Sequence, residues 1–231
     1  MRLLWIRHGQ MEIRASTVKD RRAVDRLFTQ EEEHGLSPRG RREAELVLEH
    51  LADRSVDALY SSTLARARET GEICARGLEL PLESTPLIAE LRVGHLIDES
   101  KSARWVSGVM NAPLRAAIKQ TILGATLVPI YFSAWRRGRT VGGETPAELD
   151  ARVRAFLSEL EARHPRDATV ALFAHGYLIF TLTHSLARSP LARLNLLRQP
   201  YLANGSITEM ELESGELKLM RWAGTDHLRG L

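Results

Sequence analysis

Two histidines in this chain are each followed by glycine, and each pair stands at the polar end of an apolar run. His8-Gly9 follows Leu3-Leu4-Trp5-Ile6-Arg7, and His175-Gly176 follows the run at 168–174. A neutral imidazole can attack phosphorus, and a second imidazole, if protonated, can stabilise charge on the phosphoryl oxygens. Each glycine lets the backbone turn sharply and a ligand approach closely. The pattern favours a site where two imidazoles act on one phosphoryl group.

Two arginines and a glutamate complete the candidate set: Arg7, Arg66 and Glu90. Guanidinium groups present planar forks that match phosphate oxygens. An ester leaving group also needs a proton, and general acid catalysis is typically worth about 10²–10⁴ in rate. Glu90 is the candidate proton donor. The candidate catalytic residues are therefore His8, Glu90 and His175, and the candidate phosphate-binding residues are Arg7, His8, Arg66 and His175.

The elements that must position these residues alternate between strand and helix patterns. Apolar runs predict buried strands at 3–6, 58–60 and 168–174. Ser37-Pro38 predicts the start of a helix that runs to about Ala52. Ser61-Ser62 closes the second strand and is expected to cap a helix over about 63–78. Because ligands bind at the carboxyl ends of strands in open parallel sheets, the candidate residues are expected to meet there.

The second half of the chain continues the alternation. Thr145 and Glu148 form a capping-box pattern, followed by an amphipathic helix marked by Leu149 through Leu160. A buried helix is expected at 177–186, and a hairpin around Ser214-Gly215. The remaining stretches are predicted to be a long loop at 10–34 and a mostly helical insertion at 95–141. Together these patterns predict one α/β domain, a sandwich with a largely parallel central sheet.

Composition narrows the class of protein. The 231 residues carry 32 Lys and Arg against 29 Asp and Glu, a net charge of +3 that suits an anionic small substrate but is too mild to argue for nucleic acid. Cys74 is the one cysteine, so the chain cannot form a disulfide within itself, and a reducing, cytoplasmic setting is expected. No stretch approaches the roughly 18 apolar residues needed to cross a bilayer. The six other histidines show no metal-ligand spacing.

The candidate residues lie in an ordered series of motifs that resembles the histidine phosphatase superfamily, also called phosphoglycerate mutase-like. The matching segments, in chain order, are Leu4–Gly9, Leu36–Gly40, Tyr60–Ala67, Leu87–Gly94, Gly143–Thr145, Ala174–Gly176 and Asn204–Ser206. The resemblance implies a three-layer α/β/α sandwich, a phosphohistidine at His8, a phosphate pocket completed by Arg7, Arg66 and His175, and proton donation by Glu90. It implies neither a metal nor an organic cofactor.

Departures from the family pattern refine the expected activity. Gln10-Met11-Glu12-Ile13 lacks the Ser-x-x-Asn pattern that glycolytic mutases of the family carry after the glycine, which favours a phosphatase of a small phosphorylated metabolite. His95-Leu96-Ile97-Asp98 stands where the family often has Trp-Glu-Gly. A segment at about 96–138 is expected to cover the substrate and shape specificity.

Three alternatives stay open from the sequence alone. A phosphoglycerate-type mutase would return the phosphoryl group to substrate, whereas a phosphatase transfers it to water. A non-catalytic module could keep the fold and bind phosphate only. A nucleic-acid binder is disfavoured because no long basic stripe with interleaved aromatics is present. The substrate and the oligomeric state are not determined by these patterns.

Overall fold

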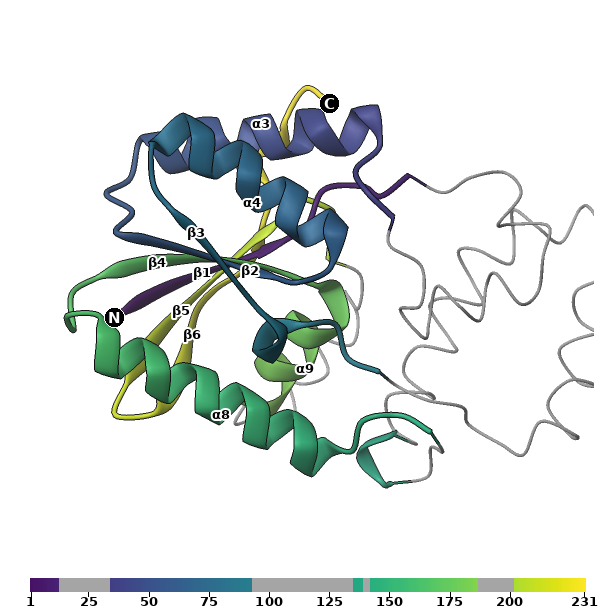
Figure 1. Cartoon of the computed structure of the whole chain (residues 1–231), viewed down its shortest axis with the longest axis vertical. Helices are drawn as coiled ribbons and strands as arrows, with labels where there is room; N and C mark the ends of the chain where they lie inside the picture. Colours follow the sequence, from purple (N-terminus) through teal and green to yellow (C-terminus); the bar gives the residue numbers. More distant parts are fainter. Residues whose placement is uncertain (13–33, 93–134, 139–141, 187–201) are drawn as a thin grey trace, which may run out of the picture. The chain divides into compact units, whose positions relative to one another are not determined.

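The computed structural model describes residues 1–12, 34–92, 135–138, 142–186 and 202–231 (Figure 1). The chain divides into two compact units, one formed by Met1–Leu91 with Ala151–Leu231 and the other by Arg92–Asp150. The segment expected to cover the substrate, 96–138, falls within the second unit, and nearly all of it lies outside the described residues. Most of the predicted 10–34 loop also lies outside them.

The first unit is built on a six-stranded mixed sheet in the order β3-β2-β4-β1-β5-β6. β3, β2, β4 and β1 pair in parallel with one another, whereas β5 pairs antiparallel with both β1 and β6. This arrangement confirms the predicted α/β class with a mostly parallel sheet. The strands are β1 (Arg2–Arg7), β2 (Ala58–Ser62), β3 (Leu82–Thr85), β4 (Thr169–Ala174), β5 (Ile207–Glu213) and β6 (Glu216–Gly224).

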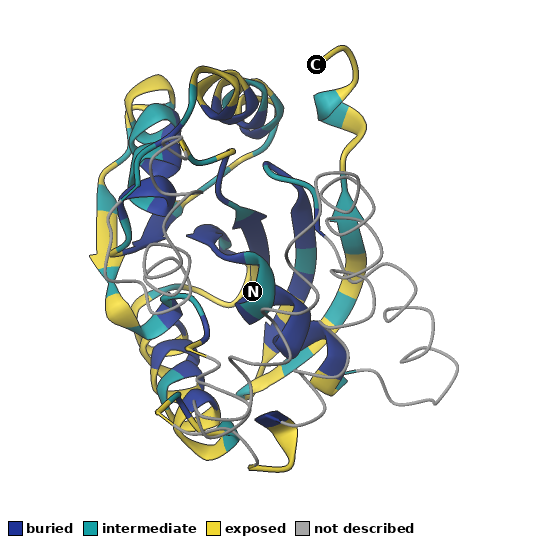
Figure 2. Ribbon diagram, turned by 90° about the vertical axis from the view of Figure 1, so that its right-hand side faces the viewer, coloured by how far each residue is buried: buried dark blue, intermediate teal, exposed yellow. Residues whose placement is uncertain are grey.

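Helices cover both faces of the sheet, which gives three layers (Figure 1). α3 (Pro38–Ala52) and α4 (Ala65–Leu78) lie on one face, and α8 (Pro146–Arg163) and α9 (Gly176–Leu186) on the other. The central strands are therefore buried on both sides, as Figure 2 shows in dark blue. Leu3, Leu4, Trp5 and Ile6 are all fully buried. Two-sided burial explains why β1 and β4 are continuous apolar runs rather than alternating ones.

Local capping explains where two of the helices begin. The Ser37 hydroxyl accepts a hydrogen bond from the Gly40 amide at 3.1 Å, as predicted for the start of α3. Thr145 and Glu148 exchange hydrogen bonds, with the Thr145 amide 2.7 Å from the Glu148 carboxylate and the Glu148 amide 3.2 Å from the Thr145 hydroxyl. The predicted capping box before α8 is therefore confirmed.

The predicted capping of α4 by Ser61-Ser62 is wrong. Both serines belong to β2, and α4 begins at Ala65 after Leu64, which makes no side-chain cap. The Ser62 hydroxyl instead accepts a hydrogen bond from the Leu64 amide at 3.2 Å. That bond shapes the turn between strand and helix, since it ends one residue short of the first helical position.

One strand was absent from the predicted set. β3 pairs in parallel with β2 at the edge of the sheet, and its sequence, LEST, has no apolar run because its side chains stay partly exposed. At the other edge the predicted hairpin is confirmed. Ser214 and Gly215 both have left-handed φ angles, 52° and 76°, typical of a two-residue turn between antiparallel strands.

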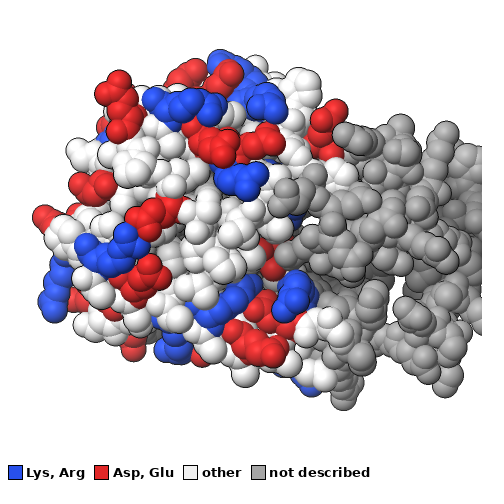
Figure 3. All heavy atoms as spheres, in the orientation of Figure 1, with Lys and Arg blue, Asp and Glu red and all other residues white. Residues whose placement is uncertain are grey.

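Charge on the described surface is mixed. Figure 3 shows acidic and basic side chains interspersed on the face in view. Several are paired, such as Arg163 with Glu83 at 2.6 Å and Arg42 with Glu45 at 2.9 Å. Among the described helices, none is long and apolar enough to cross a bilayer.

Candidate active site

The sheet order brings the two histidines together. β1 and β4 are parallel neighbours in a register that pairs Arg7 with Ala174, so His8 and His175 leave the same edge of the sheet. The His8 amide donates to the Ala174 carbonyl at 3.0 Å. The two imidazole rings lie 5.2 Å apart, centroid to centroid, and are inclined by 59°. This separation leaves both rings able to contact one tetrahedral group.

Hydrogen bonds define the tautomer of His8. Its Nδ1 lies 2.7 Å from the Gly9 carbonyl oxygen, which can only accept, so Nδ1 carries the proton. Its Nε2 accepts from the Nε–H group of Arg66 at 3.1 Å. Burial, followed by the charges of Arg66 and Arg7, holds the pKa of His8 well below its usual range. His8 is therefore neutral, with its nucleophilic lone pair on Nε2.

His175 is fully buried, and neither of its ring nitrogens has a hydrogen-bond partner among the described residues. Its pKa is also held well below the usual range, mainly by burial and then by the charges of Arg66, His8, Arg7 and Arg152. A buried imidazole normally has a partner. The ring is therefore ready to bond an incoming group at the site.

Both predicted arginines lie at this edge of the sheet. Arg66 stands in the first turn of α4 and is 9% exposed, and burial lowers the pKa of its guanidinium. Arg7 ends β1 and donates to the Leu202 carbonyl. A side chain at Gly176 would bring its Cβ within 3.3 Å of the Arg7 guanidinium, so the glycine leaves room for that group beside the start of α9. Two cationic forks thus flank the histidine pair.

Glu90 lies half-buried just after a short 3₁₀ turn, Pro86–Ile88, and reaches the start of α9. Its carboxylate accepts from the amides of Leu91 at 2.9 Å, Leu178 at 3.0 Å and Tyr177 at 3.3 Å. Burial raises the pKa of Glu90, against the opposing effect of these amides and of Arg66. The structure therefore brings the fifth predicted residue to the segment that directly follows His175.

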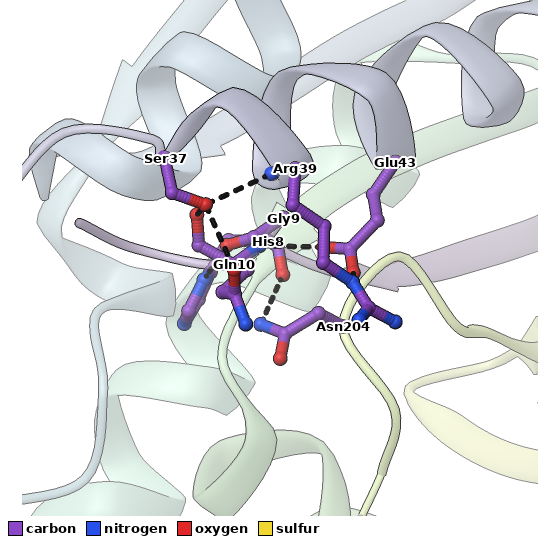
Figure 4. Close-up of polar contacts among 8 residues, drawn as sticks. His8, Gly9, Gln10, Ser37, Arg39, Glu43 and Asn204 are labelled. Carbon is purple, nitrogen blue, oxygen red and sulfur yellow. Dashed lines mark hydrogen bonds and ion pairs between the residues drawn. The ribbon is translucent and has the colours of Figure 1, made fainter. Parts of the chain in front are cut away.

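The loop that carries His8 is held by α3 (Figure 4). A Cβ on Gly9 would lie 2.3 Å from the Gly40 carbonyl oxygen, so only glycine permits the two backbones to pack this closely. The Gln10 amide donates to the buried Glu43 carboxylate at 2.6 Å. The Ser37 hydroxyl donates to the Gln10 side chain at 2.9 Å.

Sequence reasoning missed three residues that hold this loop: Glu43, Thr70 and Asn204. The Thr70 hydroxyl accepts from the Gly9 amide at 3.0 Å and donates to the Arg66 carbonyl at 2.7 Å. The side-chain amide group of Asn204 donates a hydrogen bond to the His8 carbonyl at 3.0 Å (Figure 4). A polar residue on the inward face of an amphipathic helix, one turn after Arg66, was the available signal for Thr70. The Asn204 turn was noted only as a motif.

No group of three or more His, Cys, Asp or Glu side chains that could hold a metal ion occurs in the described part of the chain. The described groups are a neutral imidazole, a second imidazole, two guanidinium groups and a half-buried carboxyl. That set can bind a tetrahedral anion, accept it on nitrogen and protonate the group that leaves.

The model of the histidine phosphatase superfamily, branch 1, matches residues 3–105 and 125–225. The chain belongs to this superfamily. Known relatives span nearly its full length. The glucosyl-3-phosphoglycerate phosphatase of Mycobacterium tuberculosis is 29% identical over 96% of this chain and 91% of its own. A probable phosphoglycerate mutase GpmB of Yersinia enterocolitica is 24% identical over 95% of this chain and 96% of its own.

Solved structures agree with this histidine phosphatase fold. The mycobacterial glucosyl-3-phosphoglycerate phosphatase in complex with VO3 superimposes with a TM-score of 0.64 at 27% identity, covering 96% of this chain and 98% of that one. A phosphoserine phosphatase mutant of Entamoeba histolytica, in complex with phosphoserine, has a TM-score of 0.62 at 18% identity, covering 98% of each chain. At that lower identity the likeness concerns the fold.

Proposed function

We propose that this histidine phosphatase hydrolyses small phosphorylated metabolites, with His8 as the nucleophile. The observation that carries the proposal is the His8 ring, which keeps its Nε2 lone pair toward the Arg66 guanidinium and lies 5.2 Å from the ring of His175. The family and its phosphatase relatives support the same reaction class. A cytoplasmic location, expected from the single cysteine, belongs to the same proposal.

In the first step His8 Nε2 attacks phosphorus, and the bond between phosphorus and the ester oxygen breaks. A phosphate oxygen is a stronger acceptor than Nε2 for the Arg66 Nε–H group, so substrate binding releases the lone pair for attack. Arg7 and Arg66 neutralise the phosphoryl oxygens, and the N–H group of the His175 imidazole donates a hydrogen bond to them. Positive charge that develops on His8 is shared with the Gly9 carbonyl through Nδ1–H.

Glu90 gives its proton to the departing oxygen, because an alkoxide leaves poorly. Burial raises the pKa of Glu90 and so favours the protonated form that this role needs. In the second step Glu90, now ionised, takes a proton from water, and the resulting hydroxide-like oxygen attacks phosphorus and breaks the P–N bond. Inorganic phosphate leaves and the starting protonation states return.

The test is mass spectrometry of the intact protein after mixing with a chromogenic aryl phosphate, with the reaction stopped by alkaline denaturation because the P–N bond of phosphohistidine is labile in acid. We expect a mass increase of one phosphoryl group on wild type and none on His8→Ala. Turnover should fall by orders of magnitude in that variant. Absence of turnover across a broad panel of phosphomonoesters would contradict the proposal, and tight phosphate binding in that case would indicate a binding module.

A phosphoglycerate-type mutase is the second candidate, supported by the likeness to probable mutases of the GpmB type. The two reactions differ in the acceptor of the phosphoryl group. Incubation with phosphoglycerates and with glucosyl-3-phosphoglycerate, the compound named for the mycobacterial relative, separates them. We expect free phosphate to exceed isomerised product.

A further inference from the structure

Arg152 holds the segment that leads into Glu90. It lies on α8, and its Nη1 and Nη2 groups donate to the carbonyls of Leu87 at 2.6 Å and Ala89 at 3.0 Å. One planar guanidinium thus holds two carbonyl groups that are two residues apart and lie immediately before Glu90. Lysine has no such fork and cannot reproduce the pair of bonds.

The position of this contact in the chain is informative. Glu90 lies just before the chain enters the second unit at Arg92, and Arg152 lies just after it leaves that unit at Asp150. Within the second unit, the Glu144 amide donates to the Arg92 carbonyl at 2.7 Å. The segment before the second unit is therefore hydrogen-bonded to Arg152, and the first residue of that unit, Arg92, is hydrogen-bonded to Glu144. Along the chain, Glu90 lies between the carbonyls that make these bonds.

The carboxyl group of Glu90 is held by hydrogen bonds from three backbone amides. Two of these amides, those of Tyr177 and Leu178, lie in the first turn after His175. A shift of the 87–89 segment by about 1 Å would misplace the proton donor relative to the leaving oxygen, and misplacements of that size can slow catalysis by about 10²-fold. Without Arg152, the Leu87 and Ala89 carbonyls would lose these two bonds to α8.

We propose that Arg152 is a positioning residue for the general acid, acting through the Leu87 and Ala89 carbonyls to fix Glu90 opposite the leaving group. This inference rests on the proposed hydrolase function. Its consequence is selective in the first step, transfer of the phosphoryl group to His8, because in that step only esters whose leaving group needs a proton depend on the placement of Glu90. A merely structural role would slow all esters alike.

The experiment compares two substrates in wild type, Arg152→Lys, Arg152→Gln and the control Arg154→Lys, which lies on the exposed side of the same helix. The dinitrophenolate group of dinitrophenyl phosphate leaves without being protonated, whereas the alkoxide of an alkyl phosphate must be protonated as it leaves. We expect kcat/KM, which reports the steps up to phosphoryl transfer to His8, to fall at least about tenfold on the alkyl ester in both Arg152 variants, with less than about a threefold change on the dinitrophenyl ester. Arg154→Lys should change neither.

A double-mutant cycle with Glu90→Gln gives a readout that does not depend on absolute rates. If Arg152 acts through Glu90, Arg152→Lys should have no further effect on the alkyl ester once Glu90 is Gln. Equal losses on both esters, additive losses in the cycle, or no loss would overturn the inference. If Arg152→Gln does not fold, Arg152→Lys, which keeps the charge and the aliphatic stem, decides the matter. Failure of wild type on every ester would instead count against the hydrolase function itself.

Discussion

At the scale of single residues, the site is defined by protonation states. Both candidate histidines are buried beside cationic groups, so each is held neutral in the folded protein. In the unfolded chain both would titrate near the ordinary histidine value of about 6.5. The unfolded state therefore takes up protons below that pH while the native state does not, and folding stability must fall as the pH is lowered.

We expect the free energy of unfolding to decrease by up to about 1.4 kcal/mol per pH unit below about pH 6.5 for each of these histidines. The variant His175→Leu should lose part of this dependence because residue 175 no longer titrates. Chemical denaturation at about pH 7.5 and about pH 5.5, in buffer free of phosphate, measures the difference. An unchanged pH dependence in the variant would contradict the low pKa of His175.

Thr70 connects the loop after β1, His8–Gln10, to α4, the helix that carries Arg66. In Thr70→Val the Gly9 amide loses its buried acceptor, at a cost of about 1–3 kcal/mol in stability, and the loop is less well placed for catalysis. Thr70→Ser keeps the hydroxyl and serves as the control. Thermal unfolding together with kcat on an aryl phosphate tests this, and a Val variant as active and stable as the Ser variant would refute it.

At the scale of elements, α3 supports the site by close backbone contact. A Cβ on Gly40 would lie 2.0 Å from the Gln10 carbonyl oxygen, so Gly40→Ala must push the helix away from the His8–Gln10 loop. Alanine is the better helix former by about 1 kcal/mol, and the substitution would stabilise α3 if nothing else changed.

We expect the steric effect to prevail, so that Gly40→Ala lowers both the unfolding temperature and kcat. Glu45→Ala, at an exposed position of the same helix, controls for the general effect of substitution there. Differential scanning calorimetry and steady-state kinetics give the two readouts. A Gly40→Ala protein more stable than wild type would show that the loop can yield.

Elements with strong local signals were predictable from the sequence. The interiors of β1 and β4 are apolar because helices cover both faces of the sheet. Ser37 and the Thr145–Glu148 pair mark helix starts through the hydrogen bonds that they form. β3 was missed because an edge strand needs no apolar run. The cap of α4 was assigned wrongly since Ser62 bonds the turn and not the helix.

In the candidate site, too, some residues were predictable from the sequence and others were not. Residue type and position at strand ends predicted His8, His175, Arg7 and Arg66, because parallel strands bring their carboxyl ends to one edge. The supporting contacts of Thr70, Asn204 and Arg152 depend on long-range hydrogen bonds between elements. Such contacts leave no periodic pattern in the sequence, so the structure was needed to find them.

At the scale of the whole molecule, five polar or charged groups are gathered at one edge of the sheet. Burial lowers the pKa of the Arg66 guanidinium, and the nearby charge of Arg7 lowers it further, since two cations repel at short range in a medium of low dielectric constant. A bound dianion would relieve this repulsion and should stabilise the folded state.

We expect inorganic phosphate to raise the unfolding temperature in a concentration-dependent way, with a smaller rise in Arg66→Met. Chloride at matched ionic strength is the control for general screening. Thermal unfolding followed by fluorescence is sufficient for the measurement. Equal shifts with phosphate and chloride would show that no specific anion site is formed.

The parallel pairing of β1 with β4 also bears on biosynthesis. The candidate nucleophile His8 is translated long before its partner strand, which begins only at Thr169, and before β5, which lies on the other side of β1 and begins at Ile207. A nascent chain leaving the ribosome therefore carries β1 without either neighbour until residues from Thr169 onward have been synthesised. Catalytic competence should arise abruptly and late in translation, and prematurely terminated chains should have none.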